Sequence, residues 1–332
     1  MRLLSLIIII TGSVHVFAEL PHYQVVDLGM GEALGISQTG NIVGADRQYW
    51  TFMNGTKHYL GYPATGGGQA DINDAGQVAA SPAFYFDGTT SYTWTPLVPS
   101  AFWHINELGV AVGRDSENYM FLNGQRTNLQ GLDGYVARDI NSHGVLAADN
   151  LGGSPVRIYD TATGSWHTLA LSTSYPAVLL WSVRFASNDN LLLLYKCVDE
   201  SSMVGEQGFL VYDGQVMRHL PADRTDYYGV DATGFNSHDI TVGTDGMHHI
   251  GWMLIQGEMH PLSQLLEASN GWSIVSANDI NDAGQIVGVG RNASGELHAV
   301  LLNPIPEPTT AALLFGGVLM LIKNRRRRHR SV

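Results

Sequence analysis

The sequence predicts an all-β protein, a β-propeller of seven four-stranded blades, and three observations support this. A phrase such as Asp279-Ile-Asn-Asp-Ala-Gly284-Gln-Ile-Val-Gly288 recurs seven times, in steps of 33 to 50 residues, a period typical of propellers and solenoids. A second hairpin follows each copy, often at a tight turn such as Asn54-Gly55. Most units then run to a leucine. Four strands in about 40 residues make one propeller blade.

The repeated phrase has the chemistry of a β-hairpin. An apolar residue ends one strand, and Asn or Ser begins the turn by hydrogen-bonding its own backbone. The residue three positions later needs positive φ, which glycine adopts freely and aspartate tolerates better than most residues. In two copies Asp189 and Asp239 replace that glycine. We therefore expect left-handed backbone at Gly40, Gly76, Gly109, Gly144, Asp189, Asp239 and Gly284.

The remaining strands of each unit follow from apolar and aromatic runs bounded by turn residues. Third strands are expected to include residues 49–52, 84–86, 119–122, 157–159, 208–212 and 252–255. Fourth strands are expected to end at Leu60, Leu97, Leu129, Leu169, Leu220 and Leu262.

The seventh unit lacks a fourth strand, because the chain meets Pro304 directly after its third strand, His298–Leu302. Tyr23–Leu28 precedes the first phrase and has no partner of its own. We expect this N-terminal strand to complete the last blade, which would remove the open sheet edges. Residues 19–304 would then form one closed propeller domain. A twisted array of β-sandwiches is the alternative.

The N-terminus indicates export. Met1-Arg2 is a short basic region, Leu3–Ile10 is apolar, and Val16-Phe17-Ala18 offers the small residues that a signal peptidase recognises. Residues 1–18 are therefore predicted to be a signal peptide. Cys197 is the single cysteine, so the chain forms no intramolecular disulfide.

The C-terminal residues 305–332 have three ordered parts. Pro306, Glu307 and Pro308 precede an apolar segment, 309–322, which is shorter than the roughly 20 residues of an ordinary membrane span. A basic stop follows at Arg325, Arg326, Arg327 and Arg328. This order resembles the PEP-CTERM sorting tail of exported proteins in Gram-negative bacteria. The resemblance implies processing by an exosortase, transient anchoring in the inner membrane, release to the cell surface or medium, and an association with exopolysaccharide.

The repeated phrase itself resembles the HAF-type repeat of exported bacterial proteins, a family that implies little further biochemistry. The chain has 18 basic and 30 acidic residues and a net charge of −12. The part between signal and tail is more acidic still, because Arg2 and the tail cations lie outside it. Such a surface repels nucleic acid, so we expect no nucleic-acid partner.

One polar position of the phrase repeats around the predicted ring, one residue before the apolar strand end. We call it the slot. It could form a polar ring that binds a cation or ligand, or it could cap hairpins and bridge neighbouring blades. Its occupants are Gly35, Asp71, His104, Asp139, Arg184, Gly234 and Asp279.

The sequence lacks the common motifs for catalysis and cofactor binding. The sequence has no Gly-x-Ser-x-Gly elbow, no phosphate-binding loop, no dinucleotide fingerprint and no His-Glu-x-x-His helix. The Asp-Ile-Asn-Asp-Ala-Gly phrase lacks the fifth-position ligand of a calcium loop. We therefore predict no metal, no cofactor and no catalytic residue.

The face of the ring that carries the connections between second and third strands, and between blades, is the candidate ligand face. Aromatic side chains with nearby arginines suit carbohydrate, although loop aromatics also pack between blades. The sequence thus favours a non-enzymatic surface or matrix protein that binds or scaffolds exopolysaccharide or another envelope component. A glycan-active hydrolase or lyase is the alternative. The candidate ligand residues are Arg47, Arg114, Tyr135, Tyr228 and Trp272.

Overall fold

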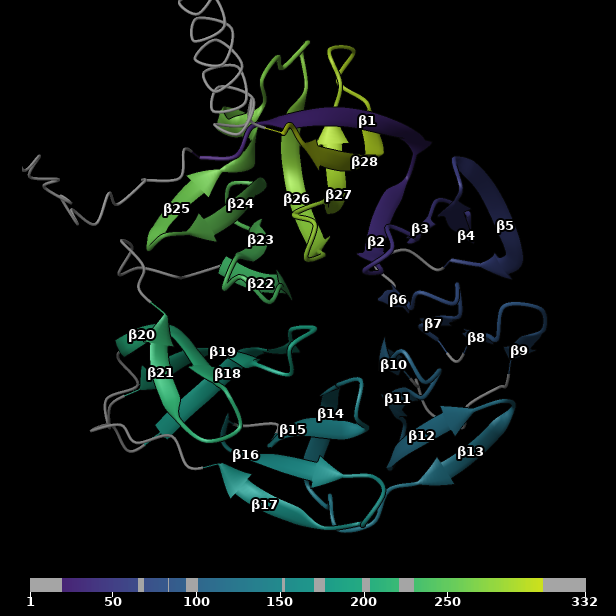
Figure 1. Ribbon diagram of the computed structural model, residues 1–332, viewed down its shortest axis with the longest axis vertical. Coiled ribbons are helices and arrows are strands. Elements are labelled where there is room, and N and C mark those ends of the chain that lie inside the picture. The colour runs from purple at the N-terminus through teal and green to yellow at the C-terminus, as the bar shows by residue number, and fades with distance from the viewer. Residues whose placement is uncertain are drawn as a thin grey trace, which may run out of the picture.

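Seven four-stranded antiparallel sheets form a ring around a central axis (Figure 1). This computed structural model describes residues 20–64, 69–82, 84–93, 101–150, 153–169, 177–198, 204–220 and 230–306. It confirms the predicted seven-bladed propeller and excludes the sandwich array. The predicted signal peptide, Tyr228 and the tail from Glu307 onward lie outside the described residues.

Within each blade the strands follow chain order from the axis to the rim, except in the last blade. Blade 1 contains β2 (Glu32–Ile36), β3 (Ile42–Ala45), β4 (Gln48–Met53) and β5 (Thr56–Pro63). Blade 2 contains β6 (Ala70–Ile72), β7 (Val78–Ala80), β8 (Phe84–Phe86) and β9 (Ser91–Thr93). Blade 3 contains β10 (Ala101–Ile105), β11 (Ala111–Arg114), β12 (Asn118–Leu122) and β13 (Gln125–Asn128). Blade 4 contains β14 (Tyr135–Ile140), β15 (Val145–Asn150), β16 (Gly153–Asp160) and β17 (Trp166–Leu169).

The second half of the ring repeats this plan. Blade 5 contains β18 (Ala177–Phe185), β19 (Leu191–Val198), β20 (Val204–Tyr212) and β21 (Met217–Leu220). Blade 6 contains β22 (Val230–Phe235), β23 (Thr241–Asp245), β24 (Ile250–Ile255) and β25 (Glu258–Pro261), followed by the 3-10 turn η1 (Leu262–Leu265). Blade 7 contains β26 (Ser273–Ile280), β27 (Ile286–Arg291), β28 (Leu297–Pro304) and β1 (Tyr23–Met30).

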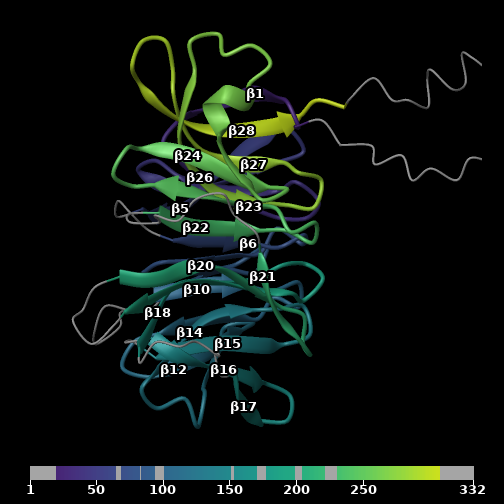
Figure 2. The same cartoon turned by 90° about the vertical axis from the view of Figure 1, so that its left-hand side faces the viewer.

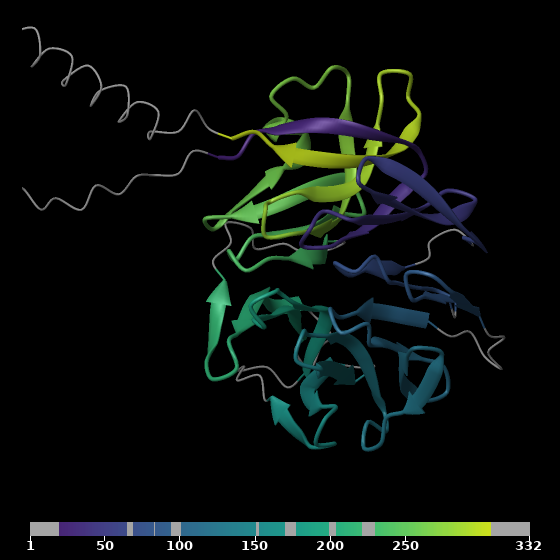
Figure 3. The same ribbon diagram turned by 45° about the vertical axis from the view of Figure 1, so that its right-hand side comes forward.

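The ring closes as the sequence predicts. β1 pairs antiparallel with β28, from Tyr23 opposite Pro304 to Met30 opposite His298. Figure 3 shows the two strands side by side at the rim of blade 7, although they come from opposite ends of the chain. Viewed from the side, the ring is a flattened disc with both ends of the described chain at this rim (Figure 2).

All seven marked turn positions have positive φ. The glycines lie between +74° and +85°, and Asp189 and Asp239 lie at +66° and +59°. Asn54-Gly55 and Asn123-Gly124 also have positive φ at both residues, which a tight two-residue hairpin requires. The expected strand ends are correct at Leu169 and Leu220, which end β17 and β21. They differ elsewhere: Leu60 lies within β5, Leu129 directly follows β13, and Leu262 begins η1 instead of ending β25. Leu97 lies outside the described residues.

Apolar side chains fill the spaces between neighbouring blades. One such cluster joins Trp50 and Ile42 of blade 1 to Val287 and Leu301 of blade 7. The glycine that ends the repeated phrase makes room for this packing. At Gly44, an added Cβ would lie 2.1 Å from the Trp50 indole and 2.4 Å from the Glu32 carbonyl oxygen.

None of the helical segments among the described residues is long and apolar enough to cross a membrane.

Candidate functional site: the central channel

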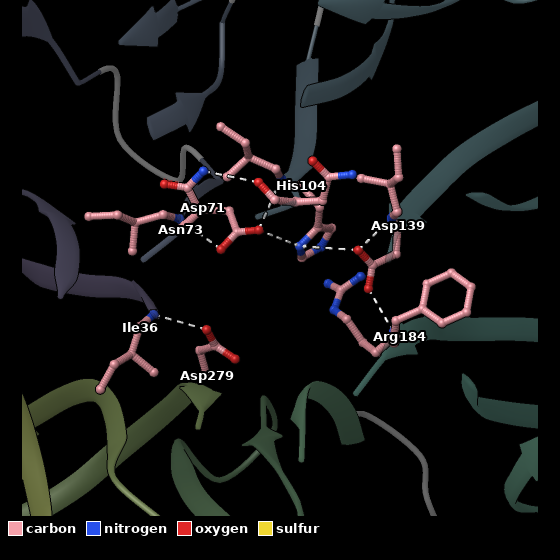
Figure 4. A network of polar contacts seen from close by, with 12 residues as sticks. Ile36, Asp71, Asn73, His104, Asp139, Arg184 and Asp279 are labelled. Atoms are coloured by element: carbon pink, nitrogen blue, oxygen red, sulfur yellow. Dashed lines mark hydrogen bonds and ion pairs between the residues drawn. The ribbon is translucent and has the colours of Figure 1, made fainter. Parts of the chain in front are cut away.

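The innermost strands carry the slot residues toward the axis, and most of these strands have a bulge close to the slot. In five blades the pairing of the first two strands shifts by one residue immediately before the slot, as between Ala137 and Asp139. Blade 5 shifts earlier, between Leu180 and Ser182. A bulge turns the following side chains relative to the sheet. Figure 4 shows the resulting convergence of Asp71, His104, Asp139, Arg184 and Asp279.

Two hollows meet at this ring of polar side chains. One, of about 170 Å³, opens among the turns of the repeated phrase. The other, of about 200 Å³, opens toward Glu32 and Gln69 at the starts of the inner strands. Both are lined by a shared set, so these residues form the waist of an axial channel: Asp71, His104, Arg184, Thr233 and Asp279.

Each slot aspartate bridges two blades. Asp139 Oδ1 accepts a hydrogen bond from the N–H of Ile140 on its own strand, at 2.7 Å, and Oδ2 accepts one from Phe185 on blade 5, also at 2.7 Å. Asp71 repeats the pattern toward Ile105 on blade 3. Asp279 repeats it toward Ile36 of blade 1, across the closure (Figure 4). Both carboxylate oxygens of each aspartate therefore already have backbone donors.

The two basic residues of the waist, His104 and Arg184, occupy different environments. His104 Nδ1 lies 3.1 Å from Asp71 Oδ2 and 3.7 Å from Asp139 Oδ1. Arg184 donates from Nε to the Thr233 carbonyl oxygen at 3.0 Å and from Nη1 to the Val183 carbonyl oxygen. It forms no ion pair with a described residue and joins blade 5 to blade 6.

Burial shifts the titration of this ring. The pKa of Asp279 is raised to about 7, first by desolvation and then by the neighbouring Asp71 carboxylate, against the N–H groups of Ile36 and Ile280. The pKa of Asp139 is raised by burial, while the charges of His104 and Arg184 oppose the shift. Among the described carboxyl groups of the waist, Asp279 therefore gains or loses its proton near pH 7.

Close approach of the next blade explains why two slot positions are glycine. A Cβ at Gly234 would lie 2.8 Å from the Ile280 nitrogen, and one at Gly35 would lie 3.1 Å from the Ala70 carbonyl oxygen. The next blade approaches too closely for a side chain at these two places. The polar ring is therefore interrupted in blades 1 and 6, which carry Gly35 and Gly234 at the slot.

A second circle of hydrogen bonds links the turns above the slot. Asn73 Nδ2 donates to the Asn106 carbonyl oxygen at 3.0 Å, and Asn106 Nδ2 donates to Asn141 in the same way at 2.9 Å. Asn236 donates to Asn281, and Asn281 donates to Ser37 across the closure. Meanwhile each Oδ1 of Asn106, Asn236 and Asn281 accepts an N–H of its own turn.

This second role of the asparagines was missed in the sequence, where Asn was assigned only to turn formation. A signal was present: Asn occupies this position in five copies, although Asp or Ser would begin a turn equally well. An aspartate cannot donate, whereas the longer amide both accepts within its turn and donates to the next blade. The choice of residue therefore encodes contact between blades.

The polar side chains of the channel connect neighbouring blades. Its aspartates are held by backbone N–H groups, and among the described residues no three His, Cys, Asp or Glu side chains are placed to hold a metal ion. Of the two interpretations of the slot, bridging of neighbouring blades therefore agrees best with the geometry. The group of side chains best suited to exchange a proton is His104 with its two neighbouring carboxylates, Asp71 and Asp139.

The four predicted ligand residues that the structure describes are spread around the ring, and none of these four lines the channel. Arg47 is exposed between β3 and β4, and Arg114 ends β11. Tyr135 begins β14, where its ring lies 4.0 Å from the guanidinium carbon of Arg157. Trp272 packs edge-on to His298 and against the core between blades 6 and 7.

Comparisons with known proteins give the fold alone. No protein-family model matches the chain, and no curated protein matches it. Among solved structures, YCF48 from Cyanidioschyzon merolae is 13% identical with a TM-score of 0.54, over 85% of this chain and 99% of that one. The β-propeller domain of Cps50 (Swd1) from Myceliophteria thermophila is 9% identical with a TM-score of 0.55, over 86% and 100%.

An inactive virginiamycin B lyase from Staphylococcus aureus, solved with quinupristin, is also similar. It is 10% identical with a TM-score of 0.51, over 85% of this chain and 100% of that one. These matches include an enzyme and proteins of other kinds. At such identities they carry no activity over to this chain.

Proposed function

We propose that this chain is an exported surface or matrix protein whose propeller binds or scaffolds an exopolysaccharide or another envelope component, without turnover. The observation that carries the proposal is the hydrogen bonding of the aspartates in the channel. The carboxylates of Asp71, Asp139 and Asp279 each hold two backbone N–H groups from two blades. A group fixed in this way stabilises the ring and is poorly placed to attack a substrate.

The size of the channel supports the same proposal. Each of its two hollows, of about 170 and 200 Å³, is smaller than ordinary small-molecule pockets of roughly 300–1,000 Å³, and the two together reach only the lower end of that range. A polymer would therefore contact the outer surface, where many weak contacts add up along its length. The predicted signal peptide and the tail resembling PEP-CTERM proteins support an extracellular position for such a surface.

The proposal is tested with the full-length protein and three soluble polysaccharides: hydroxyethyl cellulose, dextran and alginate. Affinity electrophoresis in gels containing each polymer measures binding, and release of reducing ends or unsaturated products measures turnover. Retardation without products is the expected result. Migration that is unchanged in all three gels would refute glycan binding.

A hydrolase or lyase is the second candidate, favoured by His104 between Asp71 and Asp139 at 3.1 and 3.7 Å. A histidine beside carboxylates can act as a general acid or base. If products form and His104→Gln abolishes them while binding is retained, the enzyme replaces the scaffold.

A further inference from the structure

One position on the third strand is equivalent in all seven blades and normally carries a buried apolar side chain. It lies opposite the residue that ends the repeated phrase, as Trp50 lies opposite Gly44 and Tyr119 lies opposite Gly113. Six blades place an apolar residue there, at most 6% exposed: Trp50, Phe84, Tyr119, Leu210, Trp252 and Val300. In blade 4 the residue is Arg157, opposite Ala148.

Blades 1 and 3 cover this inner aromatic ring with a cation from the fourth strand. Lys57 Nζ lies 4.1 Å from the ring centre of Trp50, and the Arg126 guanidinium carbon lies 4.2 Å from that of Tyr119. The order is the expected one, because the apolar ring is buried and the charge reaches water.

Blade 4 reverses this order. The fourth-strand residue equivalent to Lys57 is Trp166, since each lies opposite the residue two places beyond the inner one. The Arg157 guanidinium carbon lies 4.0 Å from the ring centre of Trp166 and also contacts Tyr135. The cation is thus inside and the aromatic ring outside, with 46% of Trp166 exposed.

The reversal leaves a buried polar group unpaired. Arg157 Nε is buried and has no hydrogen-bond partner among the described residues, although Nη1 donates to the Gly131 carbonyl oxygen. A buried N–H without a partner is unfavourable by about 1–3 kcal/mol, and the contacts of the guanidinium with Tyr135 and Trp166 act against this cost. An aromatic ring placed outward at one of seven equivalent positions points to a use for the exposed ring.

We infer that Trp166 is a sugar-binding platform, on which the apolar face of a pyranose ring of a neutral polysaccharide stacks. This inference rests on the proposed function and names its contact residue. The guanidinium of Arg157 holds the indole in one orientation, so little side-chain freedom is lost when a sugar binds. Gly131, whose Cβ would come within 3.4 Å of the indole nitrogen, keeps the edge of the ring uncovered.

The surroundings of Trp166 suit a sugar better than a protein partner. A protein interface needs a contiguous apolar patch at its centre, whereas the neighbours of Trp166 along the chain are exposed and polar, including Thr163, Ser165 and His167. A single aromatic ring outside a contiguous apolar patch matches the one apolar face of a pyranose. The net charge of −12 disfavours a polyanionic glycan.

The test compares Trp166→Ala and Trp166→Phe with a matched control, Tyr59→Ala, in full-length protein. Tyr59 is an exposed aromatic residue of an outer strand, at 57% exposure, in a blade with the ordinary order. Affinity electrophoresis with hydroxyethyl cellulose, dextran and alginate gives the dissociation constants, and thermal melting confirms that each variant is folded.

We expect Trp166→Ala to weaken binding of a neutral polysaccharide about tenfold. Trp166→Phe should retain most of the affinity, and Tyr59→Ala should bind like the parent. Equal binding by the parent and Trp166→Ala would overturn the platform and leave the proposed function standing, as would binding of alginate alone. A parent that binds none of the three polymers would refute the proposed function itself, and the platform with it.

Discussion

Ring closure by the first strand can be tested at a single side chain, Tyr23. It is 1% exposed and lies in the core shared by blades 6 and 7, with its hydroxyl 3.5 Å from the sulfur of Met253. Truncation to alanine removes this aromatic ring and leaves the backbone pairing of β1 with β28 in place. The change therefore isolates the packing contribution of the closing strand.

The expected magnitude follows from the burial of Tyr23. Replacing a fully buried large aromatic residue by alanine costs about 3–5 kcal/mol, because transfer energy is lost and a cavity remains. For a domain of this size each kcal/mol lowers the melting temperature by about 2–4 °C, so Tyr23→Ala should melt on the order of 10 °C below the parent. Loosened β1 would also expose β28 as a sheet edge, which favours aggregation.

Differential scanning fluorimetry with light scattering measures both effects. The control is Gln24→Ala, on the same strand and paired with Asn303 but exposed to solvent. It should melt within about 1 °C of the parent. If Tyr23→Ala and Gln24→Ala melted together, with no added scattering, closure by β1 would contribute nothing to stability and the argument would be wrong.

Further predictions concern a turn, the channel and the tail. Gly284 has φ +74°, and the nearest described atom to an added Cβ would be Pro304 Cγ at 3.7 Å, so Gly284→Val should lower the free energy of unfolding by about 1–3 kcal/mol in a urea titration because of the backbone conformation. Asp239→Gly should be near neutral, because relief of the positive φ opposes the loss of the surface ion pair with Arg218. Because the folded-state pKa of Asp279 is about 7, above the usual 3.8, its contribution to stability is present in acid and lost as pH rises through 7. Asp279→Asn should flatten this slope, and parallel pH curves would contradict it. The intact mass of protein recovered from its native host should lack residues 325–330; a full-length mass would exclude tail removal.

The blade count and the turns could be predicted because their causes are local. A left-handed residue such as Asp239 is recognisable from the turn residues beside it, and the missing fourth strand near Pro304 is a matter of counting strands. Both follow from a few neighbouring residues and need no knowledge of contacts between blades.

The direction of the slot side chains could not be predicted in the same way. In five blades it follows a one-residue bulge, and a shift of one residue moves every following side chain to the other face of a strand. The five residues skipped at these bulges share no chemical type: Leu34, Trp103, Arg138, Thr233 and Asn278. Likewise the sequence of a loop aromatic such as Trp272 does not distinguish packing from display.

The pairing of β1 with β28 also fixes the order in which this protein can fold. Asp27 and His298 interact across the closure although 271 residues separate them in the chain, so the strand that a ribosome makes first is among the last to find its partner. Contacts this distant along the chain slow folding. Any chain that ends before β28 leaves β1 unpaired, and the Asp279 and Asn281 bridges from blade 7 to blade 1 would be missing as well. A shortened product would thus be an open ring in which β1 and the side of blade 1 that faces blade 7 have no partner. In the complete chain both are paired with blade 7.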